Sequence, residues 1–116
     1  MSKSDTKIFS EATQKLYDAI MEIKYGRPFH SFNFIMLHNI YMLGSVLYYH
    51  LDESILSDTD FDKLCKYLLA NFDEAKKVIR HADETFIKAN LEAGTGYSIK
   101  FSAIWWNIAQ HYQRIK

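Results

Sequence analysis

Apolar residues recur at helical spacing along most of this chain. Between about residues 5 and 25 they fall at three- and four-residue intervals from Ile8 to Ile23, which predicts a helix with one buried face. Gly26 and Pro28 follow directly. This order is typical of a helix end, because glycine favours the position after the last turn and proline cannot continue the helix.

The second predicted helix, from about residue 31 to residue 50, is apolar around most of its circumference. A helix of this kind is usually buried between others, so we expect it to be the central helix of the fold. Gly44 lies inside it, where glycine costs about 1 kcal/mol relative to alanine. We interpret Gly44 as a place where a neighbouring helix or a ligand comes close.

The third predicted helix begins with strong capping residues. Ser57 suits the N-cap because its side-chain oxygen can accept a hydrogen bond from a free backbone N–H group of the first turn. Asp60, three residues later, completes an approximate capping box. Phe61 then opens a compact apolar stripe, and the helix is expected to end near Ala70.

A fourth helix is predicted to follow almost without a break. Asn71 and Glu74 form a second capping box, and the apolar stripe after them extends to about Ala93. Gly94 then fits the position of a helix C-cap. Residues 97–101 alternate between apolar and polar, which allows a short extended piece, but no neighbouring segment offers it a strand partner.

The last segment, from about residue 102 to residue 115, is an amphipathic helix. Ile104 and Trp105 lie on its apolar side, which leaves Trp106 at the border. Partly exposed aromatic residues are over-represented at interface hot spots, so Trp106 is the candidate partner-binding residue. The alternative is that the loop at 94–98 folds over it.

Composition limits the class of protein. A chain of 116 residues with 48% apolar residues predicts one domain, 1–116, that is all-α: a small bundle of about five helices with a helix–turn–helix core at 31–70. The net charge of zero gives no electrostatic case for duplex nucleic acid or an anionic membrane. The chain has a single cysteine, Cys65. No apolar run is long enough to span a bilayer, and the first residues of the sequence do not resemble a signal peptide. We therefore expect a cytoplasmic protein.

The acidic cluster at the start of the third helix is the first candidate for chemistry. Asp58, Asp60 and Asp62 have the alternate spacing that opens a calcium loop. That loop requires glycine at its sixth position and a bidentate acid at its twelfth, where this chain has Lys63 and Leu69. The spacing therefore does not predict a calcium site, and the histidines show no helical metal-binding pair either.

Two of these carboxylates border the buried face of the helix. Asp58 lies about 60° and Asp62 about 100° from Phe61 on the helical wheel. This border can line a groove against the preceding helix, where Tyr48 and Tyr49 lie. Carboxylates beside aromatic rings can hold a cationic or hydroxylated ligand such as a ribosylated pyridinium. The alternative is a solvated first turn whose charges complement the helix dipole.

The segments 48–52 and 57–64 together resemble the N-terminal Ia domain of bacterial NAD-dependent DNA ligases. In that family the helical domain closes over NAD and binds its nicotinamide mononucleotide half through Tyr, His, Asp, Tyr and Asp. By position, three of these are matched and two are replaced, Tyr49 standing for His and Phe61 for the second Tyr. The resemblance thus implies a ligand-binding set, which comprises Tyr48, Tyr49, Asp58, Phe61 and Asp62.

The resemblance covers only about residues 41–69. The chain has no Lys-x-Asp-Gly nucleotidyl-transfer motif and no four-cysteine zinc motif, so it implies a free-standing, non-catalytic relative without ligase activity. The bound ligand would be NAD or nicotinamide mononucleotide, with no other cofactor. We associate such forms with phage and mobile-element accessory proteins, which act in the host cytoplasm.

The second hypothesis is an interaction protein that inhibits or regulates a host protein, of the anti-defence type. In that case the motif is only scaffold, and Trp106 with the acidic helical faces contacts the partner. An enzyme is disfavoured because no nucleophile–base pair or metal set can be assembled from the spacing. Cys65 falls on a core stripe and is interpreted as a small buried residue rather than a nucleophile. The sequence leaves the oligomeric state open.

Overall fold

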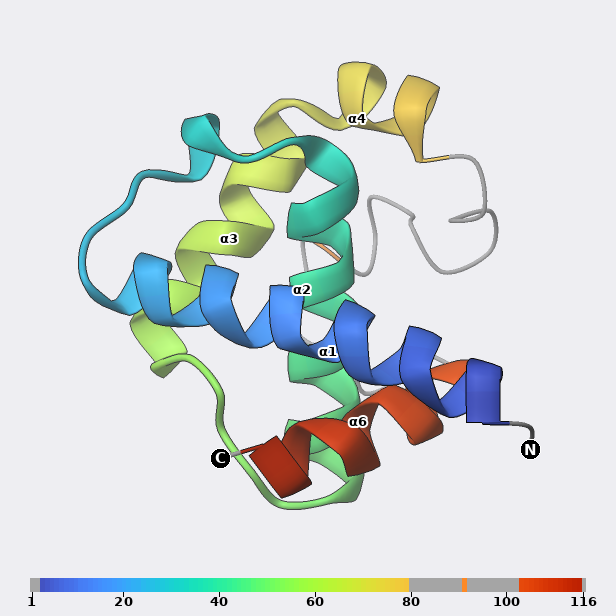
Figure 1. The fold of residues 1–116 in the computed structure, drawn as a ribbon. Coiled ribbons are helices and arrows are strands. Elements are labelled where there is room, and N and C mark those ends of the chain that lie inside the picture. Colours follow the sequence, from blue (N-terminus) through green and yellow to red (C-terminus); the bar gives the residue numbers. More distant parts are fainter. Residues whose placement is uncertain (1–2, 80–90, 92–102, 116) are drawn as a thin grey trace.

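The computed structural model describes residues 3–79, 91 and 103–115, and these residues are arranged in helices without a strand (Figure 1). This confirms the predicted small all-α bundle of about five helices. The elements follow in the order α1 (Lys3–Lys24), η1 (Phe29–Ser31), α2 (Phe34–His50), α3 (Asp58–Ala70), α4 (Phe72–Val78) and α6 (Ala103–Ile115).

Helix α2 is the centre of the fold, as its all-round apolar pattern predicts. Helices α1, α3, α4 and α6 all pack against it, and α1 also packs against α6 (Figure 1). Residues 40–47 of α2 are buried without interruption. Because every face of this stretch meets a neighbour, the helix has no polar side to present to water.

The start of α2 differs from the sequence prediction. Residues Phe29–Ser31 form a separate 3-10 turn, and α2 begins only after Asn33. The Asn33 side chain accepts a hydrogen bond from the backbone N–H of Met36 at 2.7 Å, which satisfies a free donor of the first turn. The apolar pattern does not reveal this cap, because phenylalanines flank Asn33 on both sides and continue the pattern across it.

The two predicted caps around α3 have different outcomes. Ser57 is confirmed as the N-cap, since its hydroxyl accepts a hydrogen bond from the backbone N–H of Asp60 at 3.1 Å. The predicted capping box at Asn71 is wrong, because Asn71 makes no side-chain bond to the start of α4. Its side-chain amide instead donates to the carbonyl of Tyr67 at 2.9 Å and so stabilises the end of α3.

Helix α4 is much shorter than predicted and ends at Val78 rather than near residue 93. At Ile79 the backbone turns to φ −89° and ψ 85°, which is not helical. No glycine or proline marks this break, and the apolar spacing continues through it, so periodicity alone could not locate it. Leu91 is helical and buried, whereas the predictions for residues 94–101 lie outside the described residues.

The predicted terminal helix is confirmed as α6, with one difference in its buried face. Ile108 and Tyr112 are buried as expected, but Ile104 is 49% exposed. Ile104 belongs to the first turn of α6.

Candidate functional site

The connection between α2 and α3 reverses the chain within a few residues. Asp52, directly after the C-cap Leu51, adopts a left-handed conformation with φ 53°. The backbone N–H of Glu53 then donates to the carbonyl of Leu47 at 2.9 Å, which ties the turn to the helix. Because Ile55 is only 3% exposed, the connection is anchored in the core and brings the start of α3 beside the last turns of α2.

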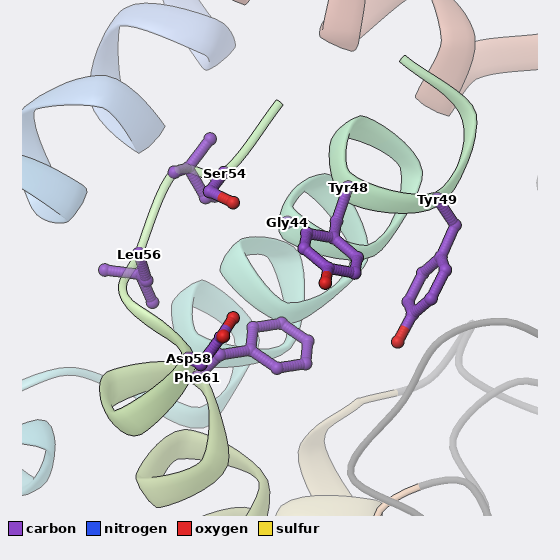
Figure 2. Close-up of a pocket in the computed structure, with 8 residues that line it drawn as sticks. Gly44, Tyr48, Tyr49, Ser54, Leu56, Asp58 and Phe61 are labelled. Carbon is purple, nitrogen blue, oxygen red and sulfur yellow. The ribbon is translucent and has the colours of Figure 1, made fainter. Parts of the chain in front are cut away.

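A cavity of about 210 Å³ lies between these two helices and their connection (Figure 2). Each of the three segments contributes to its lining. The lining residues are Gly44, Tyr48 and Tyr49 from α2, Ser54, Ile55 and Leu56 from the connection, and Asp58 and Phe61 from α3. Four of the five residues named by the sequence resemblance therefore share one cavity.

Gly44 permits the close packing at the base of this cavity. A Cβ atom at this position would lie 3.2 Å from Cε2 of Phe61 and 3.3 Å from Cδ1 of Ile55. The prediction that a neighbour comes close to Gly44 is confirmed for α3 and for the connection that precedes it. The glycine therefore allows the Phe61 ring to lie closer to α2 than a side chain at this position would permit.

The aromatic lining has a rigid part and an exposed part. The Phe61 ring stacks on the ring of Tyr41, with centroids 5.7 Å apart and planes at 18°, and Tyr41 is fully buried. Burial also raises the pKa of Tyr41 far above its ordinary value, so its hydroxyl stays protonated. Tyr48 is 48% exposed and meets Tyr49 edge to face at 4.8 Å. Figure 2 shows the Tyr48 ring directed toward Phe61 and Asp58.

Asp58 supplies the charge of the site. Among the described residues that line the cavity it is the only one with a formal charge. It is exposed and lies in the first turn of α3, where the positive end of the helix dipole favours a carboxylate. The cavity therefore combines aromatic surface, hydroxyl groups and one negative charge, which suits a ligand that is planar and cationic or neutral.

Asp62, the fifth residue of the predicted set, is not part of the cavity lining. Its Oδ2 atom lies 2.9 Å from Nζ of Lys66, in an i, i+4 ion pair on the exposed surface of α3. On the helical wheel Asp62 is farther from Phe61 than Asp58 is, and this difference places it outside the groove. The Lys66 partner is visible in the sequence as an i, i+4 pair.

Sequence reasoning did not find the contribution of the connection. Ser54, Ile55 and Leu56 complete the cavity, but they lie in a stretch without helical periodicity. The available signal was the pair Ile55 and Leu56, because two adjacent apolar residues in a short polar connection indicate burial. Ser54 carried no such signal.

Trp106, the predicted partner-binding residue, is partly buried. Its ring lies against the imidazole of His50 at the end of α2, with ring centroids 5.0 Å apart. The alternative covering by residues 94–98 lies outside the described residues. Trp106 thus contacts the core on one side and keeps only part of its surface for a partner.

Cys65 is fully buried, which confirms the interpretation of it as a core residue. Burial, together with the nearby Asp62, raises the pKa of its thiol to about 12, so the reactive thiolate is suppressed. Among the side chains that the structure describes, in residues 11–79, 91 and 103–115, no group of three or more His, Cys, Asp or Glu is placed to hold a metal ion. In the same part of the chain, no helix combines the length and the apolar character that a membrane span requires.

Comparisons with known proteins do not assign the chain to a family. The scan against family models and the searches of curated proteins and of solved structures gave no match.

Proposed function

We propose that this domain is a non-catalytic module that binds the nicotinamide end of a nicotinamide nucleotide in the cavity between α2 and α3. The observation that supports the proposal is the convergence of Tyr48, Tyr49, Asp58 and Phe61 on one cavity. These residues come from two helices, and the sequence resemblance selects them without any information on their spatial arrangement. Four of the five residues that the resemblance implies therefore line one cavity, and Asp62 lies outside it.

The chemistry of the lining matches a ribosylated pyridinium. The ring would lie against Phe61 and Tyr48, because a cation is attracted to the face of an aromatic ring. The Asp58 carboxylate would offset the positive charge of the pyridinium. The hydroxyl groups of Ser54 and Tyr49 can donate to or accept from the carboxamide and the ribose.

The size of the cavity limits how much of the ligand it encloses. Its volume of about 210 Å³ exceeds the roughly 150 Å³ of a cavity known to bind benzene but is below the roughly 300 Å³ at which most ligand pockets begin. The ring and part of the ribose would be enclosed, and the phosphate would lie outside. Because the described lining contains no lysine or arginine, we expect the phosphate to add little affinity.

Calorimetric titration with nicotinamide riboside, nicotinamide mononucleotide and NAD tests this proposal. We expect comparable affinities for the three ligands and a loss of about tenfold in Asp58→Asn, which corresponds to about 1.4 kcal/mol. Asp62→Asn is the matched control, because it removes the same charge one turn away and outside the cavity. The absence of binding at millimolar ligand, or an equal loss in both variants, would overturn the proposal.

A further inference from the structure

A second and larger hollow, of about 900 Å³, lies away from the α2–α3 cavity and shares none of its lining residues. Side chains from α1, α2, α4 and α6 line it, so it is formed where the four helices meet around the first half of α2. We call it the four-helix groove. Its occupant can be inferred from two properties of its surface, apolar exposure and charge.

Three of the five large apolar residues that are exposed in the described part of the chain line this groove. Ile35 is 50% exposed, Val78 is 45% exposed and Ile104 is 49% exposed, and all three line it. They belong to three different helices, α2, α4 and α6, so the fold has brought them together from distant parts of the sequence. Single exposed apolar residues are ordinary on a protein surface, but a contiguous group marks a site of interaction.

The formal charges among the described residues of the four-helix groove are all positive. Lys15 from α1 and Lys77 from α4 line it from two different helices, and none of the described residues in its lining is acidic. His38 also lines it, but burial lowers the pKa of this imidazole to about 4, so it is neutral near pH 7. The described lining of the groove is therefore mostly apolar, with a positive charge from each of two helices.

We propose that the four-helix groove binds an acidic amphipathic helix of a partner protein. The apolar row of such a helix would cover Ile35, Val78 and Ile104, in the manner of a helix docked in a hydrophobic groove. Carboxylates beside that row would meet Lys15 and Lys77, and this complementarity selects an acidic partner over a basic one. The inference is independent of the proposed nucleotide site, because the two cavities share no residue.

Fluorescence anisotropy with two designed peptides tests this inference. Both peptides carry the same leucine row at helical spacing, flanked by glutamates in one and by lysines in the other. We expect the full chain to bind the glutamate peptide at least about tenfold more tightly than the lysine peptide, with a preference that weakens as salt rises. Val78→Asn/Ile104→Asn should weaken both peptides, because it removes apolar surface from the groove.

Charge reversal separates a specific site from general attraction. Lys15→Glu/Lys77→Glu should reverse the preference between the two peptides. Lys24→Glu/Lys63→Glu makes the same charge change at two exposed lysines outside the groove and should leave the preference unchanged. An equal effect of both double variants would overturn the proposal.

Two other results would also overturn it. Concentration-dependent self-association in sedimentation, abolished by Ile104→Asp, would assign the groove to a second copy of the chain. Failure of both peptides to bind at millimolar concentration would show that the groove does not accept an external helix.

Discussion

Replacing Gly44 by alanine sets helix propensity against packing at the base of the α2–α3 cavity. Gly44 lies in the middle of α2, where alanine is favoured over glycine by about 1 kcal/mol. The added methyl group would lie 3.2 Å from Cε2 of Phe61 and 3.3 Å from Cδ1 of Ile55, which is closer than ordinary van der Waals contact. The sign of the change in stability depends on whether these two neighbours can move.

The structure indicates that they cannot move freely. Phe61 is stacked on the fully buried ring of Tyr41, and Ile55 is itself buried in the connection. Overpacking costs about 1–3 kcal/mol, which equals or exceeds the gain of about 1 kcal/mol from propensity. We therefore expect Gly44→Ala to lower the free energy of unfolding by about 1 kcal/mol and the melting temperature by about 4 °C.

Urea unfolding followed by far-ultraviolet circular dichroism measures this change, and a double variant identifies its cause. In a Phe61→Leu background the added methyl group meets only Ile55 at close range, so Gly44→Ala should cost clearly less there than in the original chain. Gly26→Ala is a useful comparison, because Gly26 has φ 101° and a Cβ atom added there would have no other atom within 4 Å. In Gly26→Ala the free energy of unfolding should fall by about 1–2 kcal/mol because of backbone strain alone, whatever residue occupies position 61. An increase in stability for Gly44→Ala alone would refute the packing argument.

Three further predictions concern the turn, the cap and the buried imidazole. Asp52 has φ 53°, so Asp52→Gly should raise the unfolding free energy by a few tenths to about 1 kcal/mol in urea, whereas the β-branched Asp52→Val should lower it. Ser57→Ala should cost about 1 kcal/mol in the same assay because the bond to the Asp60 N–H is lost, and Ser57→Asp should restore most of it. Burial lowers the pKa of His38 from 6.5 to about 4, so between these pH values the unfolded state binds more protons than the folded state. The unfolding free energy should therefore fall by up to about 3 kcal/mol as the pH drops from 6.5 to 4. His38→Gln should flatten this part of the pH profile, and an unchanged slope would contradict the assignment.

The sequence is informative where local chemistry decides the structure. Ser57 caps α3 and Gly26 ends α1 because the relevant interactions are made within a few residues of each. The all-round apolar pattern of α2 also predicts its central position correctly. In these cases the interactions that determine the structure lie within the segment itself, so the sequence of the segment is enough to predict it.

The predictions from sequence fail where the structure of a residue depends on a partner outside its own segment or on a competing hydrogen-bond acceptor. The capping pattern places Asn71 at the start of α4, but the carbonyl of Tyr67 one turn earlier takes its side-chain amide. The exposure of Ile104 depends on which helices reach the first turn of α6, and the apolar spacing of a single helix contains no such information. The contribution of Ile55 to the α2–α3 cavity has the same origin, since it depends on how the connection folds onto α2.

Asp58 and Asp62 show how much the three-dimensional arrangement adds to the functional argument. Both carboxylates match the resembled motif, and both lie on the border of the buried face of the helix, so the sequence assigns them to one ligand. In the structure Asp58 lines the cavity, whereas Asp62 pairs with Lys66 on the outside of α3. A ligand held in this cavity would therefore meet one negative charge rather than two, which favours a singly charged pyridinium over a dication. The motif contains both carboxylates but only Asp58 lines the cavity, so a comparison of Asp58→Asn with Asp62→Asn tests the site rather than the motif.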